Sequence, residues 1–210
     1  MNKLTTTLLT VLLLSCAAQG QVISIQSGLV ASKLDWEASS FTNSAYNSYR
    51  QSIPVFIGFD YLNKKYFNLS SQVGYVEKGG QGAGTRVNGV DFKSETWAKY
   101  VSFNTCGNVK YQFDKRITVY ANIGPRIDFL VDSDNSFFKV YQKNNGLNKI
   151  NVGLTYGAGI KYRVNKTIIG FSTNRNYNFN PIVDLSSSGT EVKVNDQTLL
   201  LLFSLGYDLK

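Results

Sequence analysis

Six charged side chains interrupt stretches in which hydrophobic and polar residues alternate. They are Asp60, Lys110, Arg126, Asp128, Lys161 and Asp208. Alternate side chains of a β-strand point to opposite faces, so all six belong to the polar faces of predicted strands. Charges enclosed by a narrow barrel are costly unless they are paired, so we expect a structural cluster of ion pairs that plugs the interior. The competing hypothesis is a gate or a proton path.

Enzymatic chemistry has little support, because the chain contains no histidine. Histidine is the most common general acid or base and also activates serine and cysteine nucleophiles. Cys106 lies on the polar face of its predicted strand, and we expect a small buried thiol there. We therefore predict no catalytic residue, no cofactor and no metal site.

The formal net charge of +8 could suggest binding to nucleic acid. Such binding needs basic residues clustered on one face, and the Lys and Arg residues of this chain are spread along it. We therefore predict no nucleic-acid partner.

Eight segments carry the strand alternation. They span residues 22–32, 52–61, 67–78, 101–113, 117–131, 150–163, 167–177 and 198–209. Three short turns, 62–65, 114–116 and 164–166, alternate with four long loops, 33–51, 79–95, 132–149 and 178–196. In an up-and-down barrel this order gathers all long loops at one rim and all short turns at the other. The predicted fold is all-β, an eight-stranded antiparallel up-and-down transmembrane β-barrel.

The direction in which the apolar face of these strands points distinguishes a membrane barrel from a soluble one. A soluble lipocalin-like binding barrel would turn its apolar face inward around a ligand. Here the polar face is rich in Gly, Ser, Thr and Asn, which suit a crowded interior, and a continuous apolar outer face requires lipid. Six aromatic residues near the short turns fit an interfacial girdle against outer-membrane lipid: Tyr61, Phe67, Tyr111, Phe113, Tyr162 and Tyr207.

The first twenty residues form a separate unit. Lys3 precedes an apolar run, and small residues follow it, in the order of a secretory signal peptide. We predict cleavage after Gly20, which leaves residues 21–210 as the barrel domain. The alternative is lipoprotein processing with acylation of Cys16.

Several short stretches resemble a known family. They are Ala18-Gln19-Gly20-Gln21, Gly28 in the first strand, Gln72-Val73-Gly74-Tyr75-Val76-Glu77-Lys78-Gly79, Ala121-Asn122-Ile123-Gly124-Pro125 and Gly153-Leu154-Thr155-Tyr156-Gly157-Ala158-Gly159. In these features the chain resembles the outer membrane protein beta-barrel domain family of Bacteroidetes, which includes PorT-like proteins. The resemblance implies an eight-stranded barrel in the bacterial outer membrane without assigned functional residues. Many such barrels end in an aromatic residue, whereas this chain ends Asp208-Leu209-Lys210.

Three function classes follow from these expectations. We favour a structural or interaction role through four long extracellular loops. One form of this role is that of an accessory component of a secretion or envelope complex. The alternatives are a narrow porin-like channel and a soluble lipocalin-like binding barrel. Eight strands leave an interior that side chains just fill, which argues against a diffusion channel.

Overall fold

The computed structural model describes residues 22–38, 46–82, 85–87, 90–92, 95–134, 147–184 and 192–209, with the backbone alone described at 38, 85–87, 90–92 and 192. The predicted signal peptide and Cys16 lie outside these ranges. Within them, all helical or strand structure is β.

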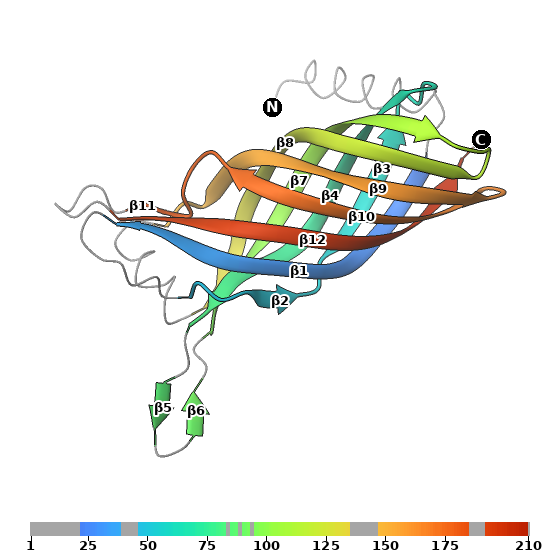
Figure 1. The fold of residues 1–210 in the computed structure, drawn as a ribbon. Helices are drawn as coiled ribbons and strands as arrows, with labels where there is room; N and C mark the ends of the chain where they lie inside the picture. The colour runs from blue at the N-terminus through green and yellow to red at the C-terminus, as the bar shows by residue number, and fades with distance from the viewer. Residues whose placement is uncertain are drawn as a thin grey trace.

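Eight strands form a closed wall. They are β1 (Val22–Ala38), β3 (Val55–Tyr61), β4 (Phe67–Gln81), β7 (Glu95–Gln112), β8 (Ile117–Ser133), β9 (Ile150–Val164), β10 (Thr167–Asn178) and β12 (Val192–Asp208). Each pairs antiparallel with the next, and β12 pairs with β1 from Val22↔Asp208 to Ala38↔Val192 (Figure 1). This closure confirms the predicted eight-stranded up-and-down barrel and leaves no open edge along these strands.

Four short strands lie in segments that the sequence predicted as loops, except that Ser52 at the end of β2 was predicted as strand. β2 (Arg50–Ser52) pairs with β1, and β11 (Val183–Asp184) pairs with β12. β5 (Thr85–Val87) and β6 (Val90–Phe92) form a separate two-stranded sheet between β4 and β7 (Figure 1). The prediction of irregular loops was therefore wrong for these residues.

The barrel strands also reach further toward the long loops than predicted. β1 continues to Ala38 instead of residue 32, and β12 begins at Val192 instead of residue 198. In these extensions the two faces exchange character: Leu34 is buried inside, whereas Asp35 is exposed outside. The period remains two, but the apolar side chains move from the outer face to the inner face.

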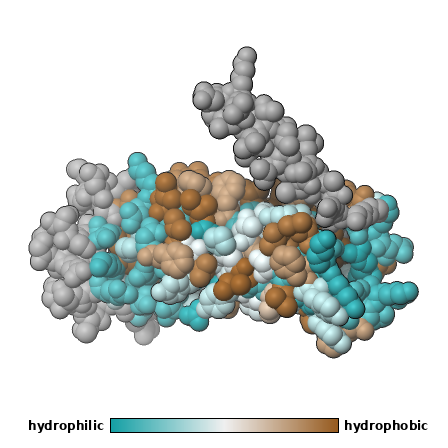
Figure 2. Space-filling model, turned by 90° about the horizontal axis from the view of Figure 1, so that it is seen from above, coloured by the Kyte–Doolittle hydropathy of each residue, from teal (hydrophilic) through white to brown (hydrophobic). Residues whose placement is uncertain are grey.

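Along the rest of each strand the outer face is apolar. Ile25, Ile57 and Phe203 are 61%, 56% and 56% exposed, although each lies inside a strand. We call this surface the apolar belt: the outward-facing side chains between the short turns and an edge at the long-loop end. That edge is marked by Ala31, Tyr75, Val101, Val131, Ile150, Tyr177 and Leu199. Figure 2 shows hydrophobic residues along the middle of the barrel and hydrophilic ones at both ends. A lipocalin-like barrel requires the opposite arrangement.

Inside the barrel, an apolar layer closes the long-loop end. Val30, Leu34, Val76, Tyr100, Val194, Leu200 and Leu202 point inward from the wall and pack with Leu147, Ile182 and Val183 from the loop segments. These side chains are all buried, so hydrophobic packing holds the described parts of two long loops against this end of the barrel.

Two local features shape the wall. Asn165 has φ 55° in the two-residue turn between Val164 and Thr167, a conformation that asparagine tolerates better than most residues. In the β7–β8 ladder, register pairs are absent between Asn104↔Arg126 and Gly107↔Ile123. Pro125 lies in this gap and has no N–H to donate, so the interruption follows from the residue type.

Candidate functional site

The first candidate site is a buried ion network within the apolar layer: on β12, Asp196 lies between Val194 on the loop side and Leu200 on the short-turn side. Lys78 Nζ lies 2.7 Å from Asp128 Oδ2 and 3.3 Å from Asp196 Oδ2, and Arg126 Nε lies 3.1 Å from Asp128 Oδ2. The side chains are at most 1% exposed. Two cations face two carboxylates, so the formal charge of the network is zero. β4, β8 and β12 contribute these residues, so the network links three separate parts of the wall.

Neighbouring polar side chains extend the network. Thr198 Oγ1 donates to Asp196 Oδ2 at 2.5 Å, and the Asn178 amide also donates to Asp196. Arg126 in turn donates to Asn178 Oδ1. The Lys78 ammonium lies 5.3 Å from the centre of the Tyr100 ring, within range of a cation–π contact. A buried network with these added hydrogen bonds holds its charges in one arrangement.

A layer of amides and hydroxyls fills the middle of the barrel. Asn122 Nδ2 donates to Asn174 Oδ1 at 2.9 Å, and Thr155 Oγ1 donates to Asn176 Oδ1 at 2.9 Å. Two cavities in this region have volumes of 20 and 10 Å³. By this measure a cavity of about 10–15 Å³ holds one water molecule, so each has room for about one water and neither has room for a hydrated ion.

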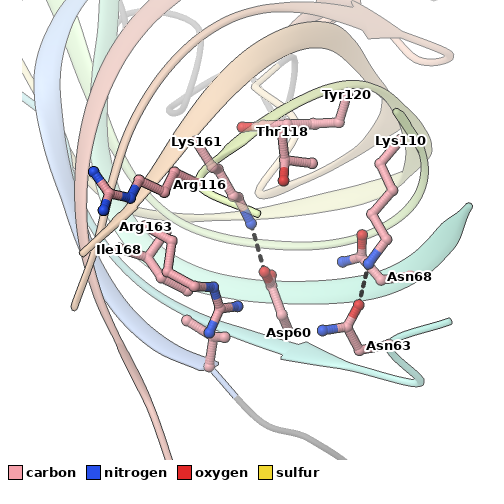
Figure 3. A pocket seen from close by; sticks show the side chains of 11 residues that line it. Asp60, Asn63, Asn68, Lys110, Arg116, Thr118, Tyr120, Lys161, Arg163 and Ile168 are labelled. Atoms are coloured by element: carbon pink, nitrogen blue, oxygen red, sulfur yellow. Dashed lines mark hydrogen bonds and ion pairs between the residues drawn. The ribbon is translucent and has the colours of Figure 1, made fainter. Parts of the chain in front are cut away.

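The second candidate site is a charged vestibule at the short-turn end (Figure 3). Lys161 Nζ lies 2.5 Å from Asp60 Oδ2, Arg163 pairs with Asp208, and Lys110 donates to Asn63 Oδ1. A cavity of 60 Å³ lies among these side chains. Lys110, Arg116, Lys161 and Arg163 line it with Asp60, so the vestibule is positively charged by formal count.

The structure divides the six predicted interior charges between these two sites. Arg126 and Asp128 belong to the buried network at the long-loop end, and Asp60, Lys110, Lys161 and Asp208 belong to the vestibule. Sequence reasoning missed Lys78, Asp196 and Arg163, which complete the ion pairs. Continuing the strand parity through Lys78 and Asp196 would have found both, because each has the inward parity of its strand.

The six predicted interfacial aromatics lie at or beside strand ends near the short turns. Tyr61 ends β3, Phe67 begins β4, and Phe113 follows β7. Tyr111, Tyr162 and Tyr207 lie one or two residues before the ends of β7, β9 and β12. All except the half-buried Tyr61 are exposed. Tyr111 and Phe113 make an edge-to-face contact with ring centres 4.9 Å apart.

Other chemistry is sparse in the described ranges. Cys106 is a free thiol that is 1% exposed inside the barrel. Among the described residues there is no cluster of His, Cys, Asp or Glu that could hold a metal ion. The described part of the chain also contains no helix that is long and apolar enough to cross a bilayer.

A closed barrel with an apolar belt and a polar, ion-paired interior is an integral membrane barrel of the outer-membrane type. The chain belongs to the outer membrane protein beta-barrel domain family, which it matches over residues 17–184. It is therefore a protein of the bacterial outer membrane, where lipid surrounds the apolar belt. The narrower Bacteroidetes, PorT-like grouping stays a prediction from the sequence.

Two solved structures illustrate the likeness. The outer membrane protein OprG from Pseudomonas aeruginosa has a TM-score of 0.55 and 13% identity, with 90% of this chain and 96% of that chain covered. Neisserial surface protein A has a TM-score of 0.51 and 13% identity, with 89% and 97% covered. At this identity the likeness shows the fold alone. None of the curated proteins compared with the chain matches it.

Proposed function

We propose that this protein is a closed, non-conducting and non-catalytic scaffold that presents its long loops to partners outside the cell. The observation that carries the proposal is the buried network of Lys78, Arg126, Asp128 and Asp196, which ties β4, β8 and β12 together across the bore. The apolar side chains packed around this network and the amide layer toward the short turns also fill the bore.

The shape of the long-loop end supports an interaction role. β1 and β12 stay paired beyond the apolar belt, from Ser32↔Thr198 to Ala38↔Val192, and their outer faces there are polar. A rigid wall that rises out of the lipid positions the loops at a distance from the membrane surface. Loops held by a rigid scaffold are the usual carriers of binding function. An accessory role in a secretion or envelope complex is the specific form of this proposal.

A loop replacement tests the proposal on intact cells. Replacing residues 83–93 by an Asn-Gly turn should remove the β5–β6 hairpin, while Gln81↔Glu95 marks the end of the β4–β7 ladder that must persist. We expect surface cross-linking to join the wild-type protein to a defined partner, and the replacement to abolish that product. The matched control is Lys99→Gln, which changes the outer wall beside the loops and should keep the product. Cross-links that are identical with and without the hairpin, or absent from the wild type, would contradict a role for this loop.

A further inference from the structure

Arg175 is a charged residue in an apolar surface. It points outward from β10 between Thr173 and Tyr177, and its neighbours across the two ladders are Tyr156 and Leu199. Of the described outward-facing side chains that form the apolar belt, it alone carries a charge. It makes no ion pair or side-chain hydrogen bond with any described residue. A charge on the lipid face of a barrel costs about 2–4 kcal/mol at the bilayer midplane and about 0–1 near an interface, so its position and its partner require an explanation.

The position of Arg175 is near the long-loop edge of the belt. Tyr177, the next outward residue on β10, marks that edge. On β12, the outward residues beyond Leu199 are Gln197 and Asn195, both polar. In outer-membrane barrels the long loops face the outside, which places this arginine at the headgroup level of the outer leaflet. A flexible arginine there can extend its guanidinium toward the polar headgroups.

Below Arg175 lies an apolar groove of 610 Å³. Val109, Ala121, Ala158 and Thr173 are consecutive partners across β7, β8, β9 and β10, and the small side chains among them form a depression. The larger Ile123 and Tyr156 border it. The depression is open to the lipid side, and its apolar lining suits a hydrocarbon chain.

On the loop side of Arg175 lies a polar recess of 350 Å³. Asn195, Gln197, Asp35 and Glu37 line it together with Arg175. Gln197 Nε2 donates to Asp35 Oδ2 at 2.9 Å, and Asn195 Nδ2 lies 3.5 Å from Glu37 Oε1. The amides hold the carboxylates on this side of the recess, and groups of both kinds hydrogen-bond hydroxyls well. The carboxylates repel a free anion but accept sugar hydroxyls.

We propose that Arg175 and the two adjoining hollows bind a phosphorylated glycolipid of the outer leaflet. Its acyl chain lies in the groove, its phosphate pairs with the Arg175 guanidinium, and its sugar occupies the recess. The order of the three environments with depth matches the order of the three parts of such a lipid. Guanidinium groups favour phosphate because they offer paired N–H donors in a planar fork. A glycerophospholipid would use the groove and the arginine but leave the recess without a sugar.

Binding of purified lipid A, a glycolipid with phosphates and acyl chains, to the detergent-solubilised barrel tests the proposal. We expect Arg175→Gln to weaken binding roughly tenfold or more, because a charge-assisted hydrogen bond is lost. The matched control, Lys99→Gln, removes the same charge from an outward-facing residue that pairs with Asp132 outside the groove. It should leave the affinity unchanged. Ala158→Leu fills the groove and should also weaken binding. Ala31→Leu makes the same change one strand beyond Leu199, outside the groove lining, and should not.

Heat-modifiable gel migration establishes whether each variant is folded. If the leucine variants do not fold, the comparison of Arg175→Gln with Lys99→Gln still tests the proposal. Equal affinity of the wild type and Arg175→Gln would overturn the proposal, as would equal binding of dephosphorylated lipid A. Phosphatidylglycerol binding as tightly as lipid A would overturn the assignment to a glycolipid. A wild-type dimer that Ala158→Leu converts to a monomer would show that a second copy of the chain occupies the groove instead.

Discussion

The Lys78 ammonium lies 2.7 Å from the Asp128 carboxylate, although β4 and β8 are not neighbours in the wall but are separated by β7. The same ammonium lies 3.3 Å from Asp196 on β12. One side chain thus joins strands that backbone hydrogen bonds do not join. We therefore predict that the network stabilises the barrel and obstructs its bore.

Lys78→Met should lower the free energy of unfolding by about 3 to 5 kcal/mol, because Asp128 and Asp196 then share only Arg126 in a buried site. The measurement is urea unfolding of the barrel in lipid vesicles, with the folded fraction at each urea concentration read from heat-modifiable gel migration. Lys99→Met is the matched control. Its pair with Asp132 is 3.5 Å long with side chains 30% and 56% exposed, and we expect about 0–1 kcal/mol there.

A double variant distinguishes the loss of the Lys78–Asp128 ion pair from a nonspecific loss of stability caused by the substitutions. Removing Lys78 and Asp128 together, as Lys78→Met with Asp128→Leu, leaves Arg126 opposite Asp196 and restores formal neutrality. The double variant should therefore lose less stability than the sum of the two single variants. Strict additivity would show that the two side chains act independently and would contradict the network.

In the vestibule, Asp60→Ala and Asp208→Ala should each lower the unfolding temperature in detergent without opening a pore. Removing the Asp60 carboxylate leaves Lys161 without its partner, and removing the Asp208 carboxylate does the same to Arg163. Since these pairs are partly exposed, we expect about 1 to 3 kcal/mol, less than for the buried network. Unchanged stability combined with new conductance would contradict the structural plug and favour the gate hypothesis.

Cys106 should resist maleimide in the folded barrel and react after unfolding in denaturant, because its side chain is 1% exposed. A Gln51→Cys variant in a Cys106→Ala background provides the matched control, since Gln51 is exposed on β2. That control should react at once in the folded protein. Rapid labelling of Cys106 in the native state would show that the bore admits small molecules.

The sequence predicts the eight strands because lipid outside and a crowded interior impose a period of two for the whole membrane crossing. The extensions of the strands beyond the apolar belt were not predicted, and the reason is physical. Beyond the apolar belt the outer face meets water, so Lys33 and Asp35 point out while Leu34 and Trp36 point in. A search for one constant apolar face therefore ends each strand at the edge of the lipid.

The candidate site was predicted only in part for the same reason. Lys78 and Asp196 lie where the sequence places strand ends and loops, so their inward parity was not counted. Which charges pair could not be predicted either, because it depends on which strands face each other across the bore. The loop contribution to the apolar layer was missed because Leu147 and Ile182 come from segments that have no alternation of their own.

Single-channel recording in planar bilayers tests the closed scaffold most directly. The obstruction by the apolar layer, the buried network and the amide layer predicts no stable large conductance for the purified wild-type barrel. Folding is checked in the same sample by heat-modifiable migration. Reproducible porin-sized steps at low voltage would contradict the account and assign the protein to the channels.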